Sequence, residues 1–362
     1  MAYTTIDDPE AHFQVNIYTG DGNDNRDLVL PGDTDMQPDM IWTKNRDTSD
    51  PNTIVDAVRG GGETLYPNSS ATEDTHGLGL TAFNSDGYRV RTGANWNTDT
   101  EKYVGWCWKA GGSTSSNTTG ATSSTVSVNS TAKFSIVQWT GTGSTTTVGH
   151  SLGVVPHVLI TKSIGSGNNS WGVYHHRAAS AISSGQVVKG SPEDGSMQLD
   201  GNSAWYDHTA YHNDTAPTST VFTVNSDSSV NHPSNTMMGY CFSEVQGFSK
   251  FGFLNGNGDN DGIFLHCGFA PTWFMSKRTD ASASWNIWNR KSNPYNPADA
   301  LSYADGTDAE ASSASYSIDF LSNGIKMRGY RADTNTNNAT HIWIAFAEAP
   351  FVNSNGVPCN AR

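Results

Sequence analysis

The feature that most constrains the fold is an internal pattern that occurs three times in the 362 residues. Each copy reads Pro-x5-Lys around an apolar centre, at 38–44, 156–162 and 271–277. Copies separated by so many residues indicate repeated whole units rather than the short repeats of a solenoid. The pattern therefore predicts three tandem units of about 100 residues, each of them a normal domain size.

Further marks recur in the same order in each unit. A Gly-x-Gly loop ends an alternating strand upstream of the proline, a turn rich in Asn, Ser and Asp follows downstream, and a strongly apolar strand closes the unit. The loops lie at 20–22, 141–143 and 256–258, the turns at 83–87, 224–228 and 320–324, and the closing strands at 105–108, 239–242 and 343–346. The closing strands are apolar on both faces, so we expect them at the centre of a sheet.

These marks predict an all-β protein of three tandem β-sandwich or jelly-roll-like repeats. Short alternating runs separated by Gly, Asn, Asp and Ser are typical of strands and turns, and about seven such runs fit each unit. We expect each unit to bury a core of its own. The predicted boundaries are an N-terminal anchor segment (1–12), the repeats (13–110, 133–247 and 248–351), a Ser/Thr/Gly-rich linker (111–132) and a C-terminal tail (352–362).

The composition excludes several classes of protein. The net charge of −14, with 21 Lys and Arg, argues against a nucleic-acid binder. No stretch approaches the length of a membrane span, so we expect no membrane insertion. The N-terminus lacks a basic segment followed by an apolar one, so no signal peptide is expected.

The ordered motifs resemble a family of virion or tail-associated proteins of marine bacteriophages. The residues that carry the resemblance are Phe13 to Gly22, Pro38 to Lys44, Phe83 to Gly87 and Tyr103 to Ala110. The resemblance implies a structural protein of the virion, made in the host cytoplasm, rather than an enzyme. It implies a tail fibre or tail-attached appendage, with other virion proteins as partners and a host-surface glycan as ligand.

Two other functions stay open at this point. One is a capsid decoration or head-fibre protein without receptor binding, and the other is a glycan depolymerase. A homotrimer is expected because tail fibres are commonly trimeric, although three copies within one chain weaken that inference.

The acidic Gly loops are candidate metal sites. Asp21 and Asn23 lie in the first loop, and Asp259 and Asp261 in the third, where alternating side-chain oxygens suit Ca²⁺. The second loop has no carboxylate, and the alternative is an exposed hairpin tip built from turn-forming residues. No other cofactor is expected.

An aromatic insertion in the second unit is the candidate ligand site. Trp205, Tyr206 and Tyr211 could stack on a sugar, and Asp207 and Asn213 could accept hydrogen bonds from its hydroxyls. Loops on a rigid sandwich often carry binding. The alternative is that this insertion packs on a neighbouring domain or subunit.

Four histidines invite a metal interpretation. His175 and His176 are adjacent, and His208 and His212 would share a helix face, but the sequence around the second pair indicates a loop. The alternative, polar loop histidines, is preferred. No catalytic motif is present, so no catalytic residue is assigned.

The four cysteines form no Cys-x-x-Cys pair, the spacing typical of zinc or redox sites. Cys107 and Cys241 occupy equivalent places in the closing strands, where the third unit has Ala345. Interchange of Cys and Ala predicts a position that needs a small buried side chain. Cys267 and Cys359 are left unpaired.

Overall fold

The structure, a computed structural model, describes residues 3–75, 77–178, 182–183, 186–187 and 190–359. Its regular structure is almost entirely antiparallel strand, with one short α-helix, α1 (Ser228–Asn231), and three single turns of 3-10 helix. The turns are η1 (Pro9–Ala11), η2 (Pro192–Asp194) and η3 (Ala314–Tyr316). The all-β prediction is confirmed.

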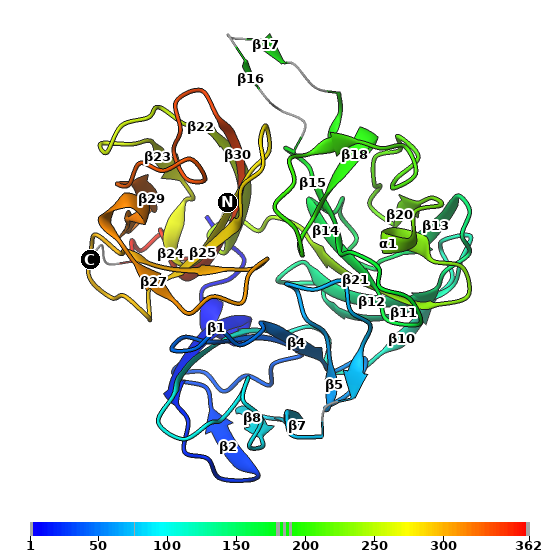
Figure 1. The fold of residues 1–362 in the computed structure, drawn as a ribbon, viewed down its shortest axis with the longest axis horizontal. Coiled ribbons are helices and arrows are strands. Elements are labelled where there is room, and N and C mark those ends of the chain that lie inside the picture. Colours follow the sequence, from blue (N-terminus) through cyan, green and yellow to red (C-terminus); the bar gives the residue numbers. More distant parts are fainter. Residues whose placement is uncertain (1–2, 76, 179–181, 184–185, 188–189, 360–362) are drawn as a thin grey trace.

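Three main sheets lie around a common centre (Figure 1). We name the units that contain them module 1 (13–110), module 2 (111–247) and module 3 (248–350). The first sheet has the order β1 (Phe13–Thr19), β9 (Lys102–Trp108), β3 (Met40–Asn45), β4 (Thr53–Asp56). The second has the order β10 (Ser115–Asn117), β11 (Ser124–Asn129), β12 (Phe134–Thr140), β21 (Thr236–Phe242), β14 (Val158–Ser163), β15 (Gly172–His175), β18 (Gly195–Gln198), β19 (Tyr206–Asp207). The third has the order β22 (Ser249–Asn255), β30 (Thr340–Pro350), β24 (Phe269–Arg278), β25 (Trp285–Asn289), β26 (Ala300–Tyr303), β27 (Ala311–Ser312).

The same four-strand arrangement recurs in the three main sheets. The strand that carries the Pro-x5-Lys lysine, which is β3, β14 or β24, pairs with the closing strand, β9, β21 or β30. The closing strand pairs on its other side with the strand that leads into the Gly-x-Gly loop, β1, β12 or β22, so it is central, as predicted. That the three units are tandem repeats of one another stays a prediction.

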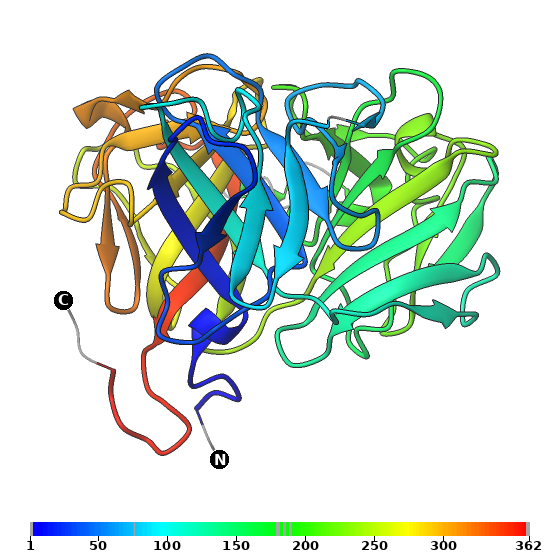
Figure 2. The same cartoon turned by 90° about the horizontal axis from the view of Figure 1, so that it is seen from below.

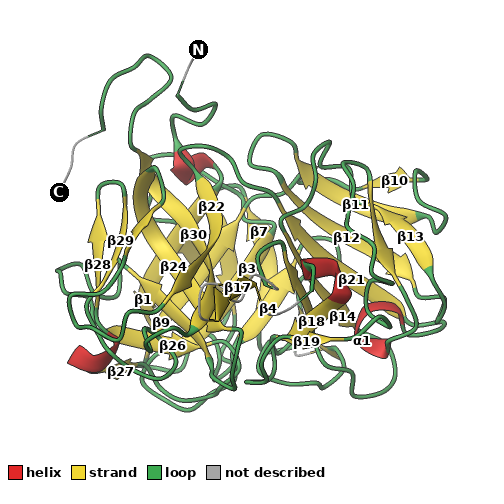
Figure 3. Cartoon of the chain, turned by 90° about the horizontal axis from the view of Figure 1, so that it is seen from above, coloured by secondary structure: helices red, strands yellow, loops and turns green. Residues whose placement is uncertain are grey.

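A smaller sheet packs on the outer face of each main sheet and makes a sandwich-like module (Figure 3). In modules 1 and 3 it has three strands, but in module 2 the strand after the turn is replaced by α1. The small sheets are β2 (Arg26–Val29), β8 (Gly87–Val90), β7 (Leu80–Asn84); β13 (Thr146–Gly149), β20 (Val221–Val224); and β23 (Phe264–His266), β29 (Gly324–Met327), β28 (Ile318–Leu321). Two-stranded ribbons are β5 (Glu63–Thr64), β6 (Asp74–Thr75) and β16 (Ile182–Ser183), β17 (Gln186–Val187).

Each closing strand serves two cores, because alternate side chains point to opposite faces. In β9, Cys107 packs in the sandwich of module 1 with Tyr88 of β8. Trp106 and Trp108 point the other way, into a large cluster that contains buried residues of all three modules. The apolar character of both strand faces therefore reflects a second core at the centre of the molecule.

Modules 1 and 2 each bury a sandwich core of their own, as predicted, but a larger cluster that the sequence did not predict contains buried residues of all three modules. At the centre, Trp108, Phe242 and Phe346 occupy equivalent places in the three closing strands. Their ring centroids are 6.4 Å (Trp108 to Phe242), 5.7 Å (Trp108 to Phe346) and 5.9 Å (Phe242 to Phe346) apart, in edge-to-face contact. Such contacts add to the free energy gained by burying the rings. The three modules are thus one packed body.

The predicted linker at 111–132 is also wrong. Its residues form β10 and β11, and β11 pairs along its length with β12 of module 2. The segment covers a sheet edge that would otherwise expose unpaired backbone groups. A segment rich in Ser and Thr does not distinguish a linker from an edge strand, because these residues suit a half-exposed edge strand as well.

The segment predicted as an N-terminal anchor folds back onto modules 2 and 3. Tyr3 donates to Gly268 O at 2.7 Å, Thr4 donates to Gln246 O at 2.7 Å, and Ile6 is buried. The C-terminal tail lies beside it, with the Ser354 N–H donating to the Asp7 carboxylate at 2.6 Å (Figure 2). Residues 3–12 are therefore part of the folded body.

The three repeated lysines are fully buried and hold the modules to one another. The ammonium of Lys44 in module 1 donates to Thr307 O of module 3 at 3.1 Å. Lys162 of module 2 donates to Ser70 O of module 1 at 2.8 Å, and Lys277 of module 3 donates to Asn202 O of module 2 at 3.3 Å. Each module thus binds a loop of the next one around a closed ring.

A second set of side chains forms hydrogen bonds between the same pairs of modules. They precede or begin β4, β15 and β25, and each donates to loop carbonyls of the neighbouring module. Asn52 donates to Gly306 O at 2.9 Å, the Trp171 indole donates to Tyr66 O at 3.0 Å, and the Trp285 indole donates to Gln198 O at 2.8 Å. The two sets together place two donors at each interface between modules.

We expect Lys44→Met to lower the free energy of unfolding by about 3 kcal/mol, because bonds from a charged donor are strong and its buried acceptors lose their partner. Lys44 also donates to Asn45 O, Thr48 O and Asp50 O. Urea unfolding followed by tryptophan fluorescence measures the change. The matched control is Lys250→Met, at a side chain that is 43% exposed, with an expected change below about 0.5 kcal/mol.

Because the modules share a core, wild-type unfolding should be a single transition. Separate transitions for the modules, or equal effects of the two lysine substitutions, would contradict the closed ring.

Candidate functional site

The three Gly-x-Gly loops share one backbone conformation. The second glycine of each loop has a positive φ, between 66° and 68°. A Cβ on the first glycine of each loop would lie about 2 Å from a backbone carbonyl oxygen, so only glycine fits. The residues concerned are Gly20, Gly22, Gly141, Gly143, Gly256 and Gly258.

A buried asparagine organises each loop. The side-chain oxygens of Asn97, Asn231 and Asn335 accept from the N–H of the residue between the two glycines, at 3.1, 2.8 and 3.1 Å. The amide groups donate back into the same loops, for example from Asn97 to Asn23 O at 2.9 Å. This explains the motif as a structural turn, which sequence reasoning missed because the asparagines lie 76, 89 and 78 residues downstream.

The acidic residues of these loops have cationic partners. Asp24 pairs with Arg91 at 2.6 Å, and Asp261 pairs with Lys326 at 2.9 Å and with Arg328 at 3.1 Å. The predicted ligand Asp21 accepts from Asn97 and lies 3.4 Å from Arg26, and Asp259 accepts from the Asp261 N–H. Hydrogen bonds from Asn23 and Asn97 lower the pKa of Asp21. The predicted metal ligands therefore serve the loop itself.

The aromatic insertion of module 2 does not form the predicted sugar platform. Trp205 and Tyr211 are buried, at 4% and 1% exposure, and the Tyr206 hydroxyl donates to that of Tyr211 at 2.8 Å. The Trp205 N–H donates to Thr279 O of module 3, so this part of the insertion packs on a neighbouring module. Asp207 and Asn213 are exposed. Trp205 and Tyr211 therefore cannot stack on a ligand.

The histidines have structural partners. His175 and His176 contact backbone carbonyls of module 3, Trp343 O at 3.3 Å and Phe251 O at 2.8 Å. His212 is buried with Nδ1 3.2 Å from Thr223 O, whereas His208 is exposed. Burial lowers the pKa of both His176 and His212 to about 4. In the described ranges, no three His, Cys, Asp or Glu side chains come together in a way that could hold a metal ion.

The described cysteines are free. Cys107, Cys241 and Ala345 are buried and oppose equivalent strand residues, which confirms the prediction of a small buried side chain there. Burial raises the pKa of Cys241 to about 12, so the reactive thiolate form is disfavoured. Cys267 is buried as well, and Cys359 is half-buried.

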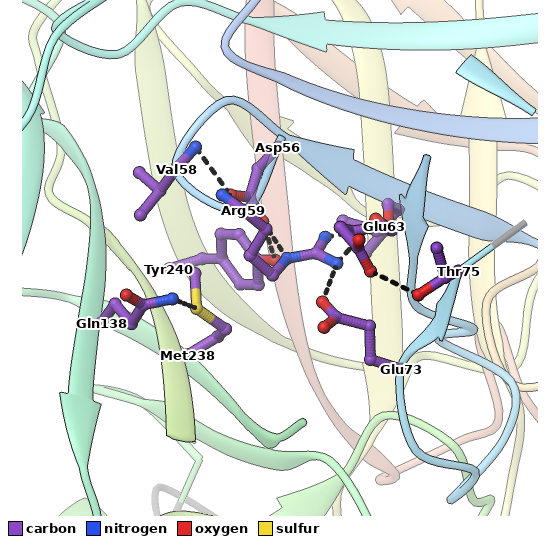
Figure 4. A network of polar contacts seen from close by, with 10 residues as sticks. Asp56, Val58, Arg59, Glu63, Glu73, Thr75, Gln138, Met238 and Tyr240 are labelled. Atoms are coloured by element: carbon purple, nitrogen blue, oxygen red, sulfur yellow. Dashed lines mark hydrogen bonds and ion pairs between the residues drawn. The ribbon is translucent and has the colours of Figure 1, made fainter. Parts of the chain in front are cut away.

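A buried charged network joins modules 1 and 2 (Figure 4). Asp56 accepts from Arg59 at 2.6 Å and from the Tyr240 hydroxyl of module 2 at 2.7 Å. Arg59 also pairs with Glu73 at 2.9 Å, and its side chain is 1% exposed. Burial raises the pKa of Tyr240, which keeps its hydroxyl protonated as a donor. The network is satisfied and sealed, which indicates a structural role at this interface.

An open groove of about 860 Å³ lies on module 3. Its lining includes a charged pair, amides and one exposed aromatic ring. Asp319 on β28 accepts from Arg328 Nε at 2.6 Å, and Arg328 directly follows β29. The lining residues that matter here are Asn260, Asn296, Ser315, Asp319, Arg328 and Tyr330.

Backbone contacts fix the walls of this groove. The Asn296 amide donates to Phe320 O at 2.9 Å and accepts from the Phe320 N–H at 3.0 Å. Gly329 donates to Ser317 O at 2.7 Å, and a Cβ there would lie 2.3 Å from Ser315 O. The groove is therefore preformed, with glycine required at one wall. A preformed groove costs little ordering entropy when a ligand enters.

A family described as a domain of unknown function, DUF7483, matches residues 8–350. The chain belongs to the DUF7483 family. Neither a curated protein nor a solved structure matches it. In the described part of this DUF7483 chain, no helix has the length and apolar character needed to cross a bilayer.

Sequence reasoning missed the groove of this DUF7483 protein for a topological reason. Its residues come from four segments, around 260, 296, 314–319 and 328–330, which only the fold of module 3 brings together. The one local signal is an aromatic residue, Tyr330, directly after Gly329 and three residues past the end of β29. Such a signal is weak, because single exposed aromatic residues are common on protein surfaces.

We expect neither EDTA nor millimolar CaCl₂ to change the melting temperature measurably, because the loop carboxylates already have partners. A site filled to 100 times its Kd would add about 2.7 kcal/mol. Differential scanning calorimetry measures the shift. A Ca²⁺-dependent rise that disappears in Asp261→Asn, but persists in Asp207→Asn, a control at an exposed carboxylate of strand β19, would restore the metal hypothesis.

Acid should destabilise the fold through its buried histidines. Between pH 6.5 and about 4 the unfolded chain binds a proton at His212 that the folded chain does not bind, so stability rises with pH in this window and is lost as the pH falls. One such group costs about 2 kcal/mol at pH 5 relative to pH 7. His212→Gln should reduce the difference between urea unfolding at pH 7 and pH 5 by that amount.

The control for this experiment is His208→Gln, at an exposed position of the same insertion. An unchanged pH dependence in His212→Gln, or an equal change in both variants, would contradict the assignment.

Proposed function

We propose that this protein is a non-enzymatic structural component of a bacteriophage particle, a tail fibre or tail-attached appendage that recognises glycans on the host surface. One observation carries the proposal: three modules that share a core and bind one another's loops form a single rigid body. A rigid scaffold that presents polar loops and a preformed groove suits recognition of an outer surface.

The motif resemblance described above supports the same assignment. The partners proposed are other virion proteins and a host glycan, without nucleic acid and without membrane insertion. The homotrimer stays a prediction. The closed ring within one chain already provides a threefold arrangement of modules, so a particle site of threefold symmetry could be filled by one chain or by three.

A capsid decoration protein would use the same rigid body without needing a ligand groove. The groove on module 3 favours the adhesive alternative, because its walls are fixed and because Tyr330 and the Arg328 side chain, which Asp319 holds from below, are exposed along it. The two functions differ in where the protein sits on the particle and in what it binds.

We expect the purified full-length chain to bind envelope polysaccharide of the host without shortening it. Binding is measured by biolayer interferometry on immobilised polysaccharide, and chain length by size-exclusion chromatography. Gold-labelled antibody should mark the tail of the particle. Absence of binding together with label on the capsomers would support decoration, and shortening of the polysaccharide would support the depolymerase alternative.

A further inference from the structure

We propose that the groove of module 3 binds a neutral saccharide, with Tyr330 stacking on a sugar ring and the Arg328–Asp319 pair bonding to its hydroxyls. The assignment rests on the proposed function, because it names the site and the ligand class for glycan recognition. It replaces the aromatic insertion of module 2, whose rings are buried.

The aromatic part of the site is exposed. Tyr330 lines the groove with 51% of its surface accessible, and Tyr295, directly before the groove residue Asn296, is 81% exposed. Most large aromatic side chains of this protein are buried, so the exposed Tyr330 in the groove is an exception. A tyrosine face gains free energy when an apolar surface covers it. The C–H face of a pyranose ring is such a surface.

The polar part of the site is held in place. Asp319 uses one oxygen to accept from Arg328 Nε, and Arg328 donates a second bond to Asp261 at 3.1 Å. A carboxylate has about four lone-pair sites and a guanidinium five N–H donors. This pair therefore retains both acceptors and donors, the combination that neighbouring sugar hydroxyls require. Asn260, which is exposed at the rim, adds an amide.

The charge balance of the groove favours a neutral ligand. Among the lining residues the cation Arg328 is matched by the carboxylate Asp319 at 2.6 Å, and beside the groove Asp261 pairs with Lys326 at 2.9 Å and with Arg328 at 3.1 Å. No positive charge is left over for an anionic sugar. The net charge of the chain, −14, adds long-range repulsion of anions.

Module 1 uses the equivalent arginine differently. Arg91 directly follows β8, as Arg328 directly follows β29, and pairs with Asp24 of its own Gly-x-Gly loop. Arg91 also donates to Gly77 O at 2.8 Å, so its guanidinium is bonded to a loop of module 1. In module 3 the corresponding guanidinium lines an open groove instead.

The probes are neutral hexasaccharides of glucose, mannose and galactose, with oligogalacturonate as the charged comparison. Saturation-transfer NMR and calorimetric titration of the full-length protein measure binding. We expect at least one neutral hexasaccharide to bind more tightly than oligogalacturonate. Tyr330→Ala should raise its Kd at least tenfold, and Tyr330→Phe should change it by less than about twofold, because the ring and not the hydroxyl makes the contact.

The matched control is Phe253→Ala, an exposed aromatic residue on β22 outside the groove, which should bind as the wild type does. Thermal unfolding verifies that each variant is folded. Equal affinity of Tyr330→Ala and wild type, tighter binding of oligogalacturonate, or no binding of any neutral probe would overturn the assignment.

The two proposals fail in different ways. Wild-type binding to host polysaccharide that is insensitive to Tyr330→Ala would overturn the groove and leave the proposed function intact. Groove binding of a neutral hexasaccharide without any binding to the host envelope would support the groove and overturn the adhesive function.

Discussion

Three aromatic rings meet at the centre of this protein, one from the closing strand of each module. Trp108, Phe242 and Phe346 lie within 6.4 Å of one another, centroid to centroid, and the large shared core surrounds them. Because the inner face of every main sheet is covered by the other two, no module has a solvent-facing sheet surface at the centre. The buried lysines then fix the rotation of the modules, since each must reach a specific carbonyl of its neighbour.

The modules differ most in their outer parts, where symmetry is not needed for packing. Module 2 replaces a strand of its small sheet with α1 and extends its main sheet with β10 and β11. Module 3 has a groove beside Arg328, whereas in module 1 the equivalent arginine, Arg91, donates to a carbonyl of a nearby loop. The centre is alike in the three modules and the periphery differs between them. One chain can therefore combine a rigid scaffold with a single specialised surface.

The all-β class, the central closing strands and the small buried position shared by Cys107 and Cys241 could be predicted, because each depends on local alternation and on repeated spacing. The shared core could not, since a strand that is apolar on both faces looks the same whether a sandwich or a neighbouring module covers it. The linker and the sugar platform failed for a related reason. Whether Ser, Thr and aromatic residues such as Trp205 face solvent or a neighbouring module depends on how the modules pack together, and the local sequence does not contain that information.

The partner of Lys44 lies 263 residues further along the chain, at Thr307. During synthesis, module 1 therefore leaves the ribosome with its local Lys44 acceptors in place but without the carbonyl of module 3 that Lys44 binds. Module 2 can close its contact with module 1 at once, because both Lys162 and Ser70 have by then been translated. The ring is completed only when module 3 emerges, so the last third of the chain completes the fold of the first.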